Sequence, residues 1–215
     1  MKNIPLLVGT LVGTLILIFG LAVVFSDSSQ QSTAIPEGLD ITAGTKNTKG
    51  NSQAKVQLVE FSDFECPACK ANLIFVNEVM TQYPDDVYLV YRHFPLYQIH
   101  PYAQVAAQFA ELAAEEGKFW QAHDLLFDRQ QDWSTLGSEQ DVLTRFEEYL
   151  TELEIDKTQF SSRIVSNDIK ERVNSDLALS QQLKLSATPT FFVNGQETPA
   201  QDLLEKVKSI LVETE

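Results

Sequence analysis

Cys66 and Cys69 are the residues of this chain whose type and spacing could do chemistry, and the sequence has no other cysteine. A Cys-x-x-Cys pair can be a redox-active disulfide, half of a zinc site, an inert disulfide or two idle thiols. Zinc would need two more ligands, and His93, His100 and His123 contain no H-x(3–5)-H pair. A disulfide across two intervening residues constrains little of the unfolded chain. We therefore favour a redox role and expect neither a metal site nor a cofactor.

The local sequence puts the first cysteine at the start of a helix. Residues 56–61 are an apolar run that predicts a short buried strand, and Pro67 stands where the first turn of a helix favours proline. Cys66 would then lie at a helix N-terminus, where unpaired N–H groups and a partial positive charge stabilise an anion. Because the thiolate is the reactive form, we expect the pKa of Cys66 to lie below that of a free thiol.

Elements before and after this unit must hold it in place. Hydrophobic periodicity predicts the helix to continue to about residue 83 and a strand at 87–94, which together suggest a βαβ unit. Further predicted elements are helices at 102–116, at about 119–127, after Ser138, near 156–160 and at 167–184, a strand at 190–193, a hairpin at Asn194-Gly195, and a last helix behind a capping box at 198–201. We expect an α/β fold in which segments 50–97 and 185–215 form one domain and 98–184 is a helical insertion.

The N-terminal end has a different composition. Ile4 begins an uncharged, mostly apolar run that ends at Phe25 and would span roughly 33 Å as a helix, against a bilayer core of about 30 Å. We expect residues 1–26 to be a single transmembrane anchor; a cleaved signal peptide is the alternative, although its apolar region is normally shorter. Polar residues then predict a flexible linker at 27–49, with a short strand near 39–41. Either interpretation places the remainder outside the cytoplasm, where a disulfide can persist.

The charge of the chain limits its partners. The net charge is −14, from 30 acidic and 16 basic residues. Such a balance argues against nucleic acid or an anionic lipid surface as the main partner.

Three separate stretches resemble the DsbA-like thiol–disulfide oxidoreductases. They are VQLVEFSDFECPAC at 56–69, GKFWQAHD at 117–124 and ATPTFFVNG at 187–195, and the resemblance extends over about 50–212. It implies a thioredoxin-like fold with an inserted all-α domain. Bacterial members with one N-terminal span are similar to this chain, so we expect a single-pass protein of the bacterial cell membrane with its catalytic domain on the extracytoplasmic side.

The resemblance also implies roles for individual residues. Cys66 would be the exposed, attacking sulfur and Cys69 the buried, resolving one. Thr188 and Pro189 would form a cis-proline loop that faces the cysteines and pairs its backbone with substrate. Glu60 would relay a proton to or from Cys69; from the sequence alone, an acid at a strand end that faces water is an equal alternative.

Other polar residues near these motifs have simpler interpretations. Asp63 and Glu65 are expected to be turn and capping residues, and His123 a packed core histidine. Members of the family carry His between the cysteines where this chain has Ala68. Ala68 supplies no charge, so we expect the pKa of Cys66 to lie above that of a variant with His at this position.

The function that follows is an exported oxidase that donates the Cys66–Cys69 disulfide to reduced, folding proteins. A membrane reoxidase of the DsbB or VKOR type would restore the disulfide. A reductase or isomerase with the same fold is the nearest alternative. A membrane-tethered chaperone or binding module with an incidental cysteine pair is the alternative from another class.

Overall fold

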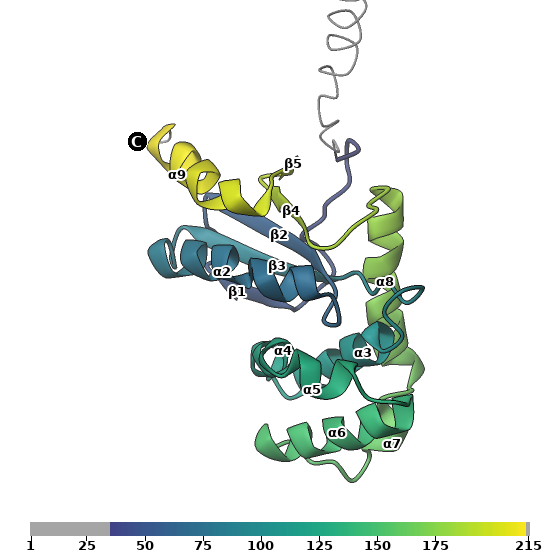
Figure 1. Cartoon of the computed structure of the whole chain (residues 1–215). Helices are drawn as coiled ribbons and strands as arrows, with labels where there is room; N and C mark the ends of the chain where they lie inside the picture. The colour runs from purple at the N-terminus through teal and green to yellow at the C-terminus, as the bar shows by residue number, and fades with distance from the viewer. Residues whose placement is uncertain (1–34, 214–215) are drawn as a thin grey trace, which may run out of the picture. The chain divides into compact units, whose positions relative to one another are not determined.

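Within residues 35–213, which the computed structural model describes, a five-stranded sheet carries the loop with the two cysteines (Figure 1). The strands lie in the order β1-β3-β2-β4-β5, with the bounds β1 Thr48–Gly50, β2 Val56–Ser62, β3 Val87–His93, β4 Thr190–Val193 and β5 Gln196–Glu197. The central strands β2 and β3 are parallel, and the other neighbouring pairs are antiparallel. The predicted βαβ and ββα segments therefore meet in one sheet.

Two helices cover one face of this sheet. Helix α2, Pro67–Gln82, connects β2 to β3, and α9, Leu203–Glu213, follows β5 and the short 3-10 helix η1, Ala200–Asp202. Val76 and Val207, one from each helix, are buried in a common cluster with side chains of the strands. Burying apolar side chains on the sheet is the main force that holds both helices there.

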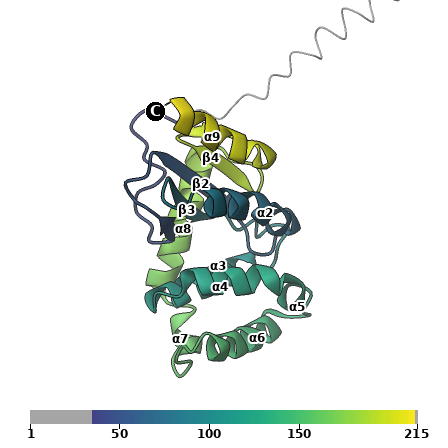
Figure 2. The same ribbon diagram turned by 90° about the vertical axis from the view of Figure 1, so that its left-hand side faces the viewer.

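The remaining helices lie between β3 and β4 in the sequence and form a second core. They are α3 Ala103–Glu115, α4 Phe119–Asp128, α5 Gln130–Ser134, α6 Glu139–Glu152, α7 Phe160–Arg163 and α8 Asn167–Gln182. In both views α3 and α4 lie between the sheet and α6 (Figures 1 and 2). Their core is rich in fully buried aromatic side chains, namely Phe109, Phe127, Trp133, Phe146 and Tyr149. The predicted α/β fold with helices between two sheet-forming segments is confirmed.

Helix α8 returns the chain to the sheet through a buried ion pair. Arg92 of β3 donates to Asp176 of α8, with Nη1 and Oδ1 2.6 Å apart and both side chains at most 5% exposed. The same guanidinium donates to the carbonyl groups of Ile41 and Ala43. One side chain therefore joins the sheet, the helical region and the segment before β1.

Three predicted elements are placed differently by the structure. The strand expected near 39–41 is wrong: the strand is β1, Thr48–Gly50, and Ile41 is instead a buried side chain of the core. The short helix expected at 156–160 begins only at Phe160, because the Asp156 carboxylate accepts from the N–H and hydroxyl of Thr158 and holds a turn there. The capping box at 198–201 does not form, because the Thr198 hydroxyl donates to a carbonyl.

The predicted anchor at 1–26 lies outside the described residues. Nowhere between residues 35 and 213 is there a helix with the length and apolar character needed to cross a bilayer.

Candidate redox site

The loop that follows the central strand β2 places Cys66 at the start of α2, and Cys69 lies within that helix. Cys66 is the N-cap residue of α2 with extended backbone, Pro67 is at the first helical position, and Cys69 lies one turn further along. Both are free thiols. Cys66 is 7% exposed and Cys69 is fully buried, so an incoming thiolate can reach only Cys66. The Cys66 sulfur, which the resemblance implies to be exposed, is thus nearly buried.

The two thiols have opposite electrostatic environments. A hydrogen bond from the Cys69 side chain is the main cause that lowers the pKa of Cys66 to about 5, and the Thr188 side chain and the N–H groups of Cys69 and Ala68 add to it. Burial is the main cause that raises the pKa of Cys69 well above its usual range, and the neighbouring Cys66 raises it further. Cys66 is therefore the thiolate and Cys69 the thiol. The pKa of Cys66 is lowered, as the sequence predicts.

A loop from the far end of the chain faces the first sulfur. The Thr188–Pro189 peptide bond is cis. The Cys66 sulfur lies 3.6 Å from the carbonyl oxygen of Thr188. The backbone on this side of Cys66 is thus the bend that directly precedes β4.

Two acidic residues fix the shape of the cysteine loop. The Asp63 carboxylate accepts from the N–H of Glu65 at 2.8 Å, from the N–H of Leu96 at 2.9 Å, and from His100, whose Nδ1 is 2.7 Å away. The N–H of Asp63 in turn points to the sulfur of Cys69, 3.4 Å away. These bonds confirm that Asp63 is a turn residue and explain why His100 is structural.

Residues of the helical region also form hydrogen bonds with the cysteine loop. The Glu65 carboxylate accepts from the N–H of Tyr102 at 2.7 Å and so caps the start of α3. The Gln130 amide donates to the carbonyl oxygens of Phe64 and Cys66, at 2.8 and 2.9 Å. Gln130 was not predicted, since nothing in a local pattern distinguishes this glutamine from others in the helical region.

Glu60 is a buried residue of β2 that shares two neighbours, Ser62 and Tyr91, with Cys69. It is 2% exposed and is the direct neighbour of Tyr91 on β3, so a role as a strand-end acid that faces water is excluded. Burial raises the pKa of Glu60 to about 7. The Ser62 hydroxyl adjoins Glu60, Tyr91 and Cys69 but has no aligned hydrogen bond to any of them. Glu60 is thus able to hold or release a proton near neutral pH.

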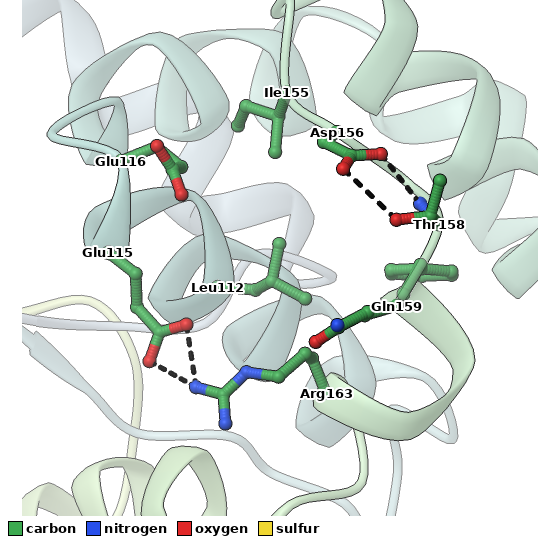
Figure 3. Close-up of a pocket in the computed structure, with 9 residues that line it drawn as sticks. Leu112, Glu115, Glu116, Ile155, Asp156, Thr158, Gln159 and Arg163 are labelled. Carbon is green, nitrogen blue, oxygen red and sulfur yellow. Dashed lines mark hydrogen bonds and ion pairs between the residues drawn. The ribbon is translucent and has the colours of Figure 1, made fainter.

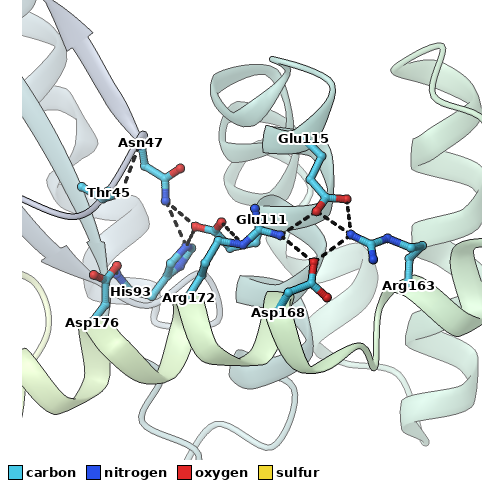
Figure 4. Close-up of polar contacts among 9 residues, drawn as sticks. All are labelled: Thr45, Asn47, His93, Glu111, Glu115, Arg163, Asp168, Arg172 and Asp176. Carbon is cyan, nitrogen blue, oxygen red and sulfur yellow. Dashed lines mark hydrogen bonds and ion pairs between the residues drawn. The ribbon is translucent and has the colours of Figure 1, made fainter.

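The other two histidines are packed inside the protein. The ring of His123 lies among five aromatic side chains, those of Phe64, Tyr91, Phe119, Trp120 and Phe127. His93 shares the Glu111 carboxylate with Asn47, at 2.9 Å from Nε2, and Arg172 extends this set of polar contacts toward Glu115 (Figure 4). Within residues 35–213, no group of three or more His, Cys, Asp or Glu side chains is placed to hold a metal ion.

Two larger surface pockets lie away from the cysteines. One, of about 300 Å³, is lined by side chains of α3, of α7 and of the segment before α7, and Glu115 and Arg163 form an ion pair in its wall (Figure 3). The other, of about 450 Å³, lies between the segment at 44–47 and helices α3 and α8. Neither is lined by a residue of the cysteine loop.

A thiolate at a helix N-terminus, a buried partner thiol one turn away and a facing cis-proline loop define a thiol–disulfide oxidoreductase. Residues 42–213 match the family model described as Thioredoxin, and the chain belongs to this family. The predicted family and enzyme class are thereby confirmed.

Solved structures share the fold. BdbD from Bacillus subtilis is 22% identical with a TM-score of 0.67, and covers 77% of this chain and 92% of its own. A thioredoxin-like oxidoreductase from Silicibacter pomeroyi is 24% identical with a TM-score of 0.60, over 75% and 91%. The α-DsbA1 of Wolbachia pipientis is 16% identical with a TM-score of 0.62, over 79% and 94%. At these identities the likeness shows the fold alone.

Curated relatives are more similar in sequence but much longer. The Na(+)/H(+) antiporter NhaA 3 of Salinispora tropica is 38% identical over 150 residues, which are 70% of this chain and 22% of that protein. The antiporter NhaA 1 of Mycolicibacterium vanbaalenii is 36% identical over 186 residues, or 83% and 28%. The chain thus spans about a quarter of the length of these relatives. Similarity to antiporters contradicts the predicted localisation as a single-pass protein of the bacterial cell membrane with an extracytoplasmic catalytic domain, and that prediction is wrong.

Proposed function

We propose that this protein is a thiol oxidase that donates the Cys66–Cys69 disulfide to reduced proteins. The observation that carries the proposal is the stabilised Cys66 thiolate at the N-terminus of α2. At pH 7 a thiol with a pKa of about 5 is about 99% ionised, whereas a free cysteine is about 3% ionised. A stabilised thiolate stabilises the reduced enzyme, which makes its disulfide a stronger oxidant.

The size of this effect follows from the two pKa values. Lowering the pKa from about 8.5 to about 5 stabilises the dithiol form by about 2.7 kcal/mol at pH 7. For a two-electron couple this corresponds to a reduction potential about 60 mV more positive. That difference favours transfer of the disulfide to the substrate.

The reaction has two exchange steps. A substrate thiolate attacks Sγ of Cys66, a bond forms between the two sulfurs, and the Cys66–Cys69 bond breaks with its electron pair on Sγ of Cys69, which takes up a proton. A second substrate thiolate then attacks the first substrate sulfur, and Cys66 leaves as a thiolate. We assign to Glu60 the transfer of this proton to Cys69. We assign to the backbone of Thr188 and Pro189 the pairing with an extended substrate.

Reduced proteins are the proposed substrates, and a membrane reoxidase of the DsbB or VKOR type is the proposed partner that restores the disulfide. The shared fold with structures titled DsbA and BdbD supports this assignment. A reductase or isomerase is the second candidate, because one solved relative with this fold, at a TM-score of 0.63, is titled a protein-disulfide isomerase. The match to antiporters covers about a quarter of their length or less, and we propose no transport activity from it.

The reduction potential of the Cys66–Cys69 couple tests the direction. We expect equilibration with glutathione buffers to give a potential above about −200 mV, and reduced, denatured ribonuclease to be oxidised stoichiometrically. A potential near about −270 mV with efficient insulin reduction would make the protein a reductase. A Cys66→Ser variant is the control: it should lose the oxidase activity, and a chaperone activity would survive it.

A further inference from the structure

A small cavity lies between the sheet and helices α2 and α4. Its walls are Leu73, Val76, Asn77 and Met80 of α2, Leu89 of β3, Glu60 of β2, Lys49 of β1, and Trp120, His123 and Asp124 of α4. The space open to the centre of a water molecule is about 10 Å³. That is about the room which a single buried water requires.

Two residues that line this cavity each have a buried polar atom without a hydrogen-bond partner. The two atoms are Oε1 of Glu60 and Nε2 of His123, and both residues are at least nine-tenths buried. Buried polar atoms in native proteins are nearly always paired with the protein or with ordered water. Because both residues line this cavity, a water molecule there is the partner that both atoms lack.

The far side of the His123 ring leads to solvent. Its Nδ1 lies 2.8 Å from the Asp124 carboxylate, and the Asp124 side chain is 65% exposed. An ionised carboxylate only accepts hydrogen bonds, so Nδ1 carries the proton of the neutral ring and Nε2 is the acceptor that faces the cavity. Burial is the main cause that lowers the pKa of His123, which keeps this neutral form.

Three other groups near Glu60 offer no route to solvent, and a fourth, Lys49, is an exposed cation in the wall of the same cavity. Burial raises the pKa of Tyr91 well above its usual range, and its fully buried hydroxyl leads to no surface. Ser62 and Cys69 are also buried. The ring of His123 is therefore the group that connects the Glu60 side of the cavity to an exposed acid.

We propose that Glu60 exchanges protons with solvent through one cavity water, His123 and Asp124, and that this route supplies the proton of Cys69 when its sulfur leaves the disulfide. The inference rests on the proposed thiol–disulfide exchange at Cys66 and Cys69. In that step the electron pair of the broken S–S bond stays on Sγ of Cys69. The proton comes from Glu60, which regains one from the cavity water. Nε2 of His123 gives its proton to the water while Nδ1 takes one from solvent through Asp124, which leaves the ring in the Nδ1–H form of the free-thiol protein. When the disulfide forms again, the proton of Cys69 leaves through the same groups in reverse order and the ring returns to the Nε2–H form.

The pH dependence of this route has a definite sign. Below a pH of about 7, Glu60 already holds the proton that Cys69 needs. Above that pH Glu60 is ionised, and the proton must enter from solvent. His123 therefore positions the water and matters at high pH, whereas a residue with a purely structural role would affect the rate equally at all pH values.

The experiment follows reduction of the oxidised protein by dithiothreitol in a single turnover between pH 6 and pH 9. Rates are measured by acid quench and thiol alkylation and are divided by the concentration of dithiothreitol thiolate. We expect His123→Phe to match the natural protein at pH 6 and to be at least threefold slower at pH 9. Asp124→Asn should show the same trend more weakly, and Gln121→Ala, an exposed change on the same helix, should show none.

A second set of measurements, made in a Glu60→Gln variant, distinguishes proton transfer through His123 from an effect of His123 on packing. In Glu60→Gln, which cannot relay a proton, His123→Phe should have no further effect at pH 9. An equal slowing at pH 6 and pH 9, or a slowing that persists in Glu60→Gln, would overturn the inference. If His123→Phe does not fold, Asp124→Asn decides the matter, because its side chain is mostly exposed. A natural protein whose disulfide neither accepts nor donates electrons would instead refute the proposed function.

Discussion

Replacing Cys69 by alanine tests the cause of the low pKa of Cys66. The hydrogen bond from Cys69 is the largest contribution that lowers this pKa, ahead of the Thr188 side chain and the N–H groups at the helix N-terminus. A hydrogen bond to a charged group contributes about 1.5–3 kcal/mol, which corresponds to about 1–2 pKa units. We therefore expect the pKa of Cys66 to rise from about 5 to about 6–7 in Cys69→Ala.

The thiolate absorbance at 240 nm and the rate of alkylation measure this pKa directly. At pH 7 the ionised share of Cys66 should fall from about 99% to between about 90% and 50%. Cys69→Ser, which keeps a donor at the same place, is the matched control and should show a smaller rise. If Cys69→Ala left the pKa near 5, the helix N-terminus alone would hold the anion, and the reasoning about Cys69 would be refuted.

Three further changes address the groups around the site. Glu60→Gln should remove a pH-dependent loss of stability: the pKa of Glu60 is raised from 4.5 to about 7, so folding is disfavoured as pH rises through this window, by about 3 kcal/mol at pH 8. Urea titrations at pH 4 and pH 8 check this, and a variant with an unchanged pH dependence would contradict it. Gln130→Ala should lower the free energy of unfolding by about 2–3 kcal/mol, because two carbonyl groups lose their donor; the exposed Gln131→Ala is the control, and equal effects would refute the assignment. Asp176→Asn should cost about 3–5 kcal/mol, since Arg92 remains as a buried, uncompensated charge, and a thermal melt within error of the natural protein would count against this.

Much of the sheet-forming part could be predicted from the sequence. Strands β2 and β3 are short apolar runs between polar residues, and Pro67 marks the start of α2, so each local pattern agrees with the final structure. The turn role of Asp63 followed from its place between a strand and a helix. The Cys pair itself needs no tertiary information, because the two cysteines are three positions apart on one helical turn.

The remaining features depend on contacts between distant parts of the chain. The segment before β1 has a polar composition, yet it is ordered by the carbonyl groups that Arg92 binds at Ile41 and Ala43. Gln130 reaches a loop 64 residues earlier in the chain. The burial of Glu60 depends on the elements that pack against β2. The alternation of residues along the strand does not predict which elements these are. The localisation rested on residues 1–26, and the similarity to antiporters contradicted it.

The hydrogen bonds across the cysteine loop make the helical region part of the catalytic apparatus. The turn that presents Cys66 is tied by His100, Tyr102 and Gln130, all of which come from the segment after β3. A trimmed enzyme reduced to its strands, α2 and α9 would keep both sulfurs yet lose every one of these ties. Anyone who wishes to miniaturise this protein, or to graft its loop onto a smaller scaffold, must therefore install substitutes for those three donors first.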